Sequence, residues 1–155
     1  MKNNNLLLIL ACAFIYSCSN SDKSKQEPPS LPPVSVVESA ANSLIIPPES
    51  GVVRVDLNNG KGSARIHKLE DQIIYVEFTN EGYKTLNAHI TPEDSKANLR
   101  FSQIILPDSR MNGPFGRDLN YDLNLDGNYK LLIHEDMMAG LPWSGNFTVT
   151  ITLQQ

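Results

Sequence analysis

The stretch Phe147-Thr-Val-Thr-Ile-Thr-Leu153, close to the C-terminal end, decides the fold class of this chain. Apolar residues alternate with threonine along it, and successive side chains of a β-strand point to opposite faces of a sheet. Its β-branched residues also favour strands over helices. The segment is therefore predicted to be a strand with one buried and one solvated face.

The same alternation recurs further upstream, and no stretch has a convincing helical period. Between the alternating segments lie turn signals such as Asn58-Asn-Gly-Lys-Gly62, Asn80-Glu-Gly82 and Asp126-Gly-Asn128. Short strands at this spacing indicate an antiparallel sandwich or barrel. We predict an all-β domain over residues 51–155, an antiparallel β-sandwich of about eight strands, which are expected at residues 53–57, 64–69, 74–78, 86–90, 99–106, 119–125, 129–134 and 147–153.

The N-terminal segment has the pattern of a bacterial secretory signal. Lys2 is its only charge, residues 6–16 are apolar, and Ile15-Tyr-Ser-Cys18 resembles a lipobox, the motif read by lipoprotein signal peptidase. We expect residues 1–17 to be a lipoprotein signal peptide and Cys18 to carry lipid. A plain secretory signal peptide is the alternative. The apolar run is short of the roughly 20 residues that a membrane span needs.

Residues 18–50 are expected to connect the lipid anchor to the domain. The part up to about Pro33 has almost no apolar residues and two proline pairs, which is typical of an extended tether. Residues 34–48 are ambiguous, because Val34, Val36 and Val37 could add an edge strand while Pro47-Pro48 breaks one. The expected location is the bacterial cell envelope, with the outer membrane and its periplasmic side favoured.

Charge and cysteine content exclude several classes of function. The 155 residues hold 13 Lys and Arg against 17 Asp and Glu, a formal net charge of −4. Loss of Lys2 with the signal makes it −5, which disfavours nucleic acid and permits a basic protein partner. Cys12 leaves with the signal and Cys18 takes lipid, so the remaining 138 residues have no thiol for a disulfide or a metal. Contact with a membrane is expected through the anchor only, and a homodimer is left open.

No catalytic or metal-binding constellation is evident. Asp122-Leu-Asn-Leu-Asp-Gly-Asn128 matches the first half of an EF-hand loop, but Ile133 stands where a bidentate Glu should close it. His134-Glu-Asp-Met-Met138 begins like a zinc-protease helix but lacks the second histidine. Without a nucleophile–base set, a phosphate loop or a cofactor motif, we expect no enzyme, no cofactor and no metal.

Two loops carry side chains suited to binding. Asn112-Gly-Pro-Phe-Gly-Arg117 offers an aromatic ring and a cation, and residues 137–145 carry the only tryptophan, Trp143. These could form a binding rim. Trp143 is interpreted more readily as a plug over one end of the core.

A family resemblance follows from motifs spread between Gly60 and Leu153. They are Gly62-Ser-Ala64, Tyr75-x-x-Phe78, Phe101-Ser-Gln-Ile104-x-x-Pro107-Asp108, Gly113-Pro-Phe-Gly-Arg117, Asp126-Gly-Asn-Tyr129 and Ala139-Gly-x-Pro-Trp143-x-Gly145-x-Phe147. Together they resemble the periplasmic inhibitors of invertebrate-type and goose-type lysozymes. The wider sandwich resembles the bacterial pre-peptidase C-terminal domain.

In that family a Ser-Gly-x-Tyr loop inserts into the lysozyme active-site cleft. The resemblance assigns this role to Asp126, Gly127, Asn128 and Tyr129, with Asp126 departing from the family serine. Residues 118–136 hold five acidic residues and only one lysine, which suits a cationic target. Arg117 is expected to make a second contact.

The resemblance thus predicts an envelope lipoprotein that inhibits a lysozyme of the invertebrate or goose type by plugging its cleft. A carbohydrate- or surface-binding module on a lipid anchor is the alternative, and a structural lipoprotein domain is a third. An inhibitor should expose the Asp126–Tyr129 turn. A sugar-binding module should expose an aromatic platform that contains Trp143 and Tyr75 or Tyr83.

Overall fold

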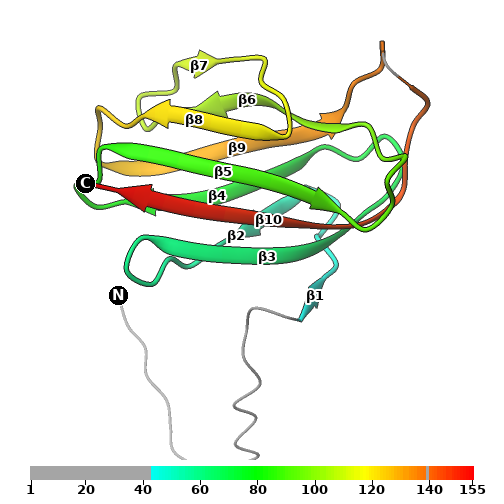
Figure 1. The fold of residues 1–155 in the computed structure, drawn as a ribbon, viewed down its shortest axis with the longest axis horizontal. Coiled ribbons are helices and arrows are strands. Elements are labelled where there is room, and N and C mark those ends of the chain that lie inside the picture. Colours follow the sequence, from blue (N-terminus) through cyan, green and yellow to red (C-terminus); the bar gives the residue numbers. More distant parts are fainter. Residues whose placement is uncertain (1–42, 139) are drawn as a thin grey trace, which may run out of the picture. The chain divides into compact units, whose positions relative to one another are not determined.

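The computed structural model describes residues 43–138 and 140–155, which form two five-stranded sheets packed face to face (Figure 1). The described part contains no helix, and so none that could cross a membrane. Cys18, the signal peptide, the tether up to residue 42 and the ambiguous valines lie outside these residues. The strands are β1 (Leu44–Ile45), β2 (Val52–Arg54), β3 (Lys61–Lys68), β4 (Ile74–Asn80), β5 (Thr85–Pro92), β6 (Leu99–Ile105), β7 (Met111–Asn112), β8 (Asp118–Asp122), β9 (Gly127–Glu135) and β10 (Gly145–Gln154).

The all-β sandwich is confirmed, with one difference in strand direction. One sheet has the order β1-β3-β10-β5-β8 and the other β2-β4-β9-β6-β7. All eight expected strands are present, and β1 and β7 are two-residue additions. The pairs β1–β3 and β2–β4 are parallel, so both sheets are mixed. The first four strands alternate between the two sheets. As a result β3 runs in the same direction as β1 in one sheet, and β4 in the same direction as β2 in the other. Hydrophobic alternation specifies the buried face of a strand but not this direction.

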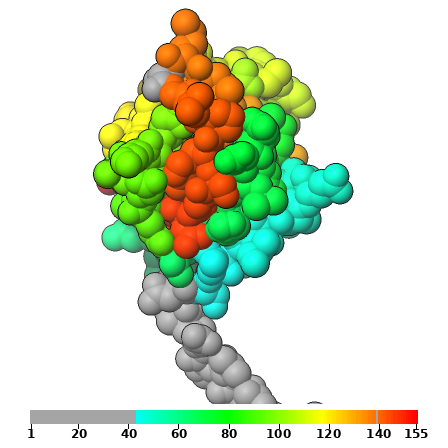
Figure 2. Space-filling model, turned by 90° about the vertical axis from the view of Figure 1, so that its right-hand side faces the viewer, coloured from blue at the N-terminus to red at the C-terminus, as the bar shows by residue number. Residues whose placement is uncertain are grey.

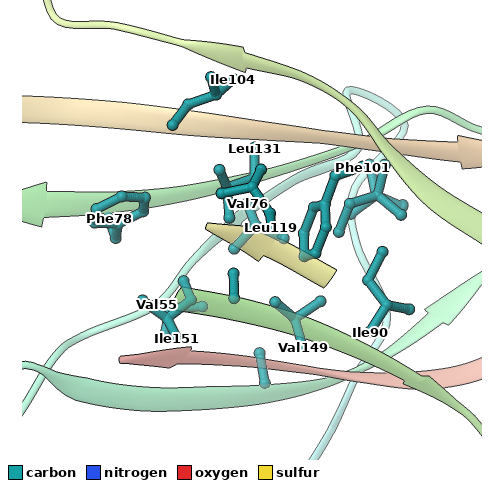
Figure 3. Close-up of a cluster of buried hydrophobic side chains, with 14 of the residues drawn as sticks. Val55, Val76, Phe78, Ile90, Phe101, Ile104, Leu119, Leu131, Val149 and Ile151 are labelled. Carbon is teal, nitrogen blue, oxygen red and sulfur yellow. The ribbon is translucent and has the colours of Figure 1, made fainter. Parts of the chain in front are cut away.

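The core lies between the sheets and is built from the inward positions of the alternating strands (Figure 3). In β10, Phe147, Val149 and Ile151 are fully buried, while the threonines between them face the outer side. Burial of such side chains contributes roughly 1.5–3 kcal/mol each. This apolar layer is the main stabilising term of a domain whose described residues include no cysteine.

The connections between strands gather at two ends of the sandwich. We call the end formed by residues 55–60, 81–84, 106–110 and 123–126 the turn end. The opposite end, formed by residues 46–51, 69–73, 93–98, 113–117 and 136–144, is the tryptophan end. Strand register fixes this division, since Lys61 pairs with Thr152 at one end and Lys68 with Gly145 at the other.

A buried ion pair lies beneath the tryptophan end. Lys68 occupies an inward position of β3, and its Nζ is 2.5 Å from Oε1 of Glu135 at the end of β9. Both side chains are almost fully buried. Lys68 Nζ also donates to the carbonyls of Leu69 and Trp143, and the Trp143 N–H donates to Glu135 Oε1. Two strands and the β9–β10 connection are therefore joined at one point.

Candidate functional site

The turn that the family resemblance singles out lies at the turn end, where residues 123–126 connect β8 to β9. Asp126 is exposed, and its Oδ1 accepts a 2.8 Å hydrogen bond from the Gly82 N–H of the neighbouring connection. Gly127 has φ = +121°, and an added Cβ would lie 3.2 Å from the Cβ of Pro107. A glycine is therefore required to bring the chain out of the turn against Pro107.

Asn128 is the exposed residue that follows. Its Oδ1 accepts a 2.8 Å hydrogen bond from Thr79 Oγ1 on the adjacent strand β4. This bond orients the side-chain amide, because the oxygen is held against β4 and the NH₂ group is left to face outward. Asp126 and Asn128 thus offer a carboxylate and an amide from one rigid turn.

The structure corrects the expected role of Tyr129. Its side chain is fully buried, stacks on Phe78 with ring centroids 5.5 Å apart, and donates from its hydroxyl to the Leu125 carbonyl. Burial raises the pKa of the hydroxyl above its ordinary value. Tyr129 supports the turn from inside and is not available to contact a partner.

A second buried side chain joins the turn to its neighbour. Asn80, at the end of β4, donates from Nδ2 to the carbonyls of Tyr83 and Leu125 and accepts from the Tyr83 N–H. One side chain therefore satisfies backbone groups of both connections, residues 81–84 and 123–126. The two form a single rim, which sequence reasoning missed although Asn80 opens one of its turn signals.

A polar cavity of about 410 Å³ lies beside Asn128. Glu77 in its wall accepts from Arg54 and is paired with Lys130 at 2.8 Å. The hydrogen bond from Lys130, and then that from Arg54, hold the pKa of Glu77 below its ordinary value. The cavity can accept a polar group of a partner that docks on the turn. Its wall is lined by Arg54, Val55, Asp56, Leu57, Asn59, Gly60, Glu77, Phe78, Thr79, Glu81, Tyr83 and Asn128.

Arg117 does not belong to this site. It lies at the tryptophan end, where its guanidinium donates to the Ala97 carbonyl and its own carbonyl accepts from the Ile90 N–H. Strand β8 separates it from the turn, and five residues of strand span roughly 17 Å. Arg117 therefore lies far from Asp126, and its second contact with a partner stays a prediction.

Only part of the acidic segment 118–136 surrounds the turn, for the same reason. Of the five acidic residues between 118 and 136, only Asp122 and Asp126 lie at the turn end, and Asp118, Glu135 and Asp136 lie at the other. The turn end also carries Asp56, Glu81 and Asp108, against Lys61, Lys84 and Arg110, so carboxylates still outnumber basic side chains there by five to three.

The histidines and tryptophan occupy separate structural positions. His67 contacts Asn146, His89 contacts Asp118, and His134 contacts the Glu135 carbonyl. Among the described residues, no three His, Cys, Asp or Glu side chains come together as a metal site would need.

Trp143 is partly buried against the core at the tryptophan end, and Tyr83 lines the cavity at the turn end. These two rings cannot form one sugar-binding platform.

Comparisons with known proteins identify the fold. No protein-family model and no curated protein matches the chain. Among solved structures, Aeromonas hydrophila PliG, a periplasmic lysozyme inhibitor of g-type lysozyme, is similar with a TM-score of 0.51 and 10% identity, over 66% of this chain and 97% of that one. The two share a fold. Salmonella Typhimurium PliG gives a TM-score of 0.42 and 18% identity, over 66% of this chain and 97% of its own.

Proposed function

We propose that this protein binds a g-type lysozyme and inhibits it, with Asp126 and Asn128 entering the active-site cleft from a turn shaped by Gly127. The likeness in fold to the inhibitor from Aeromonas hydrophila carries the proposal, since that protein acts on g-type lysozyme. The exposed, hydrogen-bonded turn supports it. No hydrolytic or transfer chemistry is proposed for the chain.

The chemistry of the turn suits a cleft that binds polysaccharide. Asp126 uses Oδ1 to hold Gly82, so Oδ2 is left to accept from a partner. The outward NH₂ of Asn128 can donate to a carboxylate or a carbonyl in the cleft. Because Asn80 and Tyr129 hold the backbone of this rim and Thr79 holds the Asn128 side chain, little conformational entropy is lost on binding.

The combined variant Asp126→Asn/Asn128→Ala is expected to weaken inhibition of a g-type lysozyme at least about thirtyfold, equivalent to about 2 kcal/mol. Asparagine keeps the acceptor for Gly82, so the turn stays folded while the charge is lost. Inhibition constants are measured from the clearing of cell-wall suspensions. Glu70→Ala, an exposed carboxylate at the tryptophan end, is the matched control and should inhibit like wild type.

Assays with invertebrate-type and chicken-type enzymes complete the experiment. Wild-type protein that is folded but inhibits none of the three lysozymes would refute the proposed function. If the double variant inhibits as well as wild type, the protein is still an inhibitor, but the turn at Asp126 and Asn128 is not the part that inhibits.

We also propose that Cys18 is acylated and tethers the domain to the outer membrane, facing the periplasm. The lipobox-like sequence before Cys18 supports this. Wild-type cells fed a fatty-acid analogue should yield a labelled protein that sediments with membranes, and Cys18→Ala should yield neither. Label that persists in Cys18→Ala would contradict it.

A further inference from the structure

The exposed apolar side chains of the domain are concentrated at the tryptophan end. Six of the eight large apolar residues that are exposed in the described part lie in its connections, and none lies in those of the turn end. Three of them, Met137, Met138 and Leu141, belong to the β9–β10 connection and are 58%, 99% and 84% exposed. We call these three residues the apolar tip. A soluble surface rarely gathers such residues without an interaction that covers them.

The connection that carries the apolar tip is firmly held at both of its ends. On the β9 side, Asp136 exchanges two hydrogen bonds with Asn98 and pairs with Arg100 at 3.0 Å. On the β10 side, the backbone of Trp143 is held by the buried Lys68–Glu135 pair. The tip projects from this base as a convex protrusion, visible in orange at the top of Figure 2.

From this arrangement we infer that the apolar tip inserts into a lipid surface, with Trp143 at the level of the headgroups. A convex apolar tip fits a fluid interface, which needs no preformed pocket. Trp143 has the amphipathic character of residues at membrane interfaces, with its ring against the core and its indole N–H towards Asp94.

The length of chain before the domain makes a membrane accessible to the tip. Ser43 follows the proposed acylated Cys18 by 25 residues, which can span at most about 80–90 Å when extended. The ten residues of β10 span only about 33 Å, so the tip can reach the membrane that holds the anchor. An anchor already at the membrane also raises the effective concentration of the tip there.

The charges around the tip indicate which lipids it meets. The connections of the tryptophan end carry Glu49, Glu70, Asp71, Glu93, Asp94 and Asp136, against Lys96 and Arg117. This surplus of carboxylates repels anionic headgroups. The surface is therefore a zwitterionic one, of the phosphatidylethanolamine or phosphatidylcholine kind.

The experiment uses Trp143 as the reporter, because it is the only tryptophan of the chain. The chain from residue 18 onward, with Cys18→Ser to exclude acylation, is titrated with vesicles of phosphatidylethanolamine and phosphatidylcholine. We expect a blue shift of the tryptophan emission and quenching by brominated lipid. Met138→Ser/Leu141→Ser should reduce the partition coefficient at least about tenfold, because the two side chains supply most of the apolar contact.

Met111→Ser is the matched control, since Met111 is also an exposed apolar residue, at 62%, but lies on β7. It should bind like wild type, and all variants should keep the wild-type melting temperature. The inference is overturned if wild type does not bind, if the double variant binds equally, or if binding requires anionic lipid. Sedimentation velocity tests the other occupant. If wild type does not bind vesicles but self-associates, and the double variant does not self-associate, the apolar tip binds a second copy of the chain instead, and the inference is overturned.

Discussion

Lys68→Met is expected to lower the free energy of unfolding by about 3–5 kcal/mol, which is the typical loss when one partner of a buried ion pair is removed. Methionine fills a similar volume, so the loss comes from the uncompensated Glu135 carboxylate and from the unpaired carbonyls of Leu69 and Trp143. Urea denaturation followed by circular dichroism measures it. The melting temperature should fall by about 10 °C or more.

The double variant Lys68→Met/Glu135→Leu should recover at least about 2 kcal/mol of this loss, because no charge is then left in the apolar interior. Arg65→Met is the control, because its pair with Glu93 is exposed and screened by solvent, so its loss should change the free energy of unfolding little. Losses that simply add in the double variant would contradict the coupling of the pair.

The same pair makes stability depend on pH. Burial raises the pKa of Glu135, but the hydrogen bonds from Lys68 and from the Trp143 N–H outweigh it and leave the pKa below its ordinary value of 4.5. The unfolded chain then binds the proton more tightly, so Glu135 contributes stability above pH 4.5 that is lost as the pH falls through the folded-state pKa. Glu135→Gln should flatten this acid dependence.

Tyr129→Ala is expected to destabilise the domain by about 3–5 kcal/mol, the range for deletion of a buried aromatic side chain. It leaves a cavity beside Phe78 and removes the hydrogen bond to the Leu125 carbonyl. The turn loses its internal support, so inhibition of lysozyme should fall together with stability. Denaturant titration and the cell-wall assay on the same samples test this.

Tyr129→Phe distinguishes internal support of the turn from direct contact between the Tyr129 hydroxyl and the lysozyme. It keeps the stack on Phe78 and removes one hydrogen bond, so it should cost about 1 kcal/mol. Inhibition by the folded variant should stay within a few-fold of wild type. Loss of inhibition without loss of stability would mean that the hydroxyl reaches the lysozyme, which its burial argues against.

Much of the fold could be predicted because the buried face of each strand is encoded locally. Alternation such as Phe147, Val149 and Ile151 marks inward positions directly. The edge strands β1 and β7 could not be predicted in the same way, because each is only two residues long. The parallel direction of β1 and β2 was not predictable either, because it depends on how the chain enters the sandwich.

The candidate site shows where motif and periodicity conflict. The family motif places Tyr129 in the inserting loop, whereas the alternation of Tyr129, Leu131 and Ile133 marks it as inward, and burial follows the alternation. Arg117 and Asp126 are near in sequence, but an intervening strand carries them to opposite ends. The Lys68–Glu135 pair joins positions 67 residues apart, and a charge on an inward face gives no indication of its partner.

The four outer edges of the sandwich have a consequence for how the protein behaves when it is crowded. In the part of the chain that the structure describes, β1, β2 and β7 expose at most three residues of strand each, and the longer β8 begins and ends with aspartate. A polymerising sheet needs a long, uncharged row of free backbone groups as its template. None of these edges provides one, so molecules held side by side at high local density are protected from templating one another into fibrils.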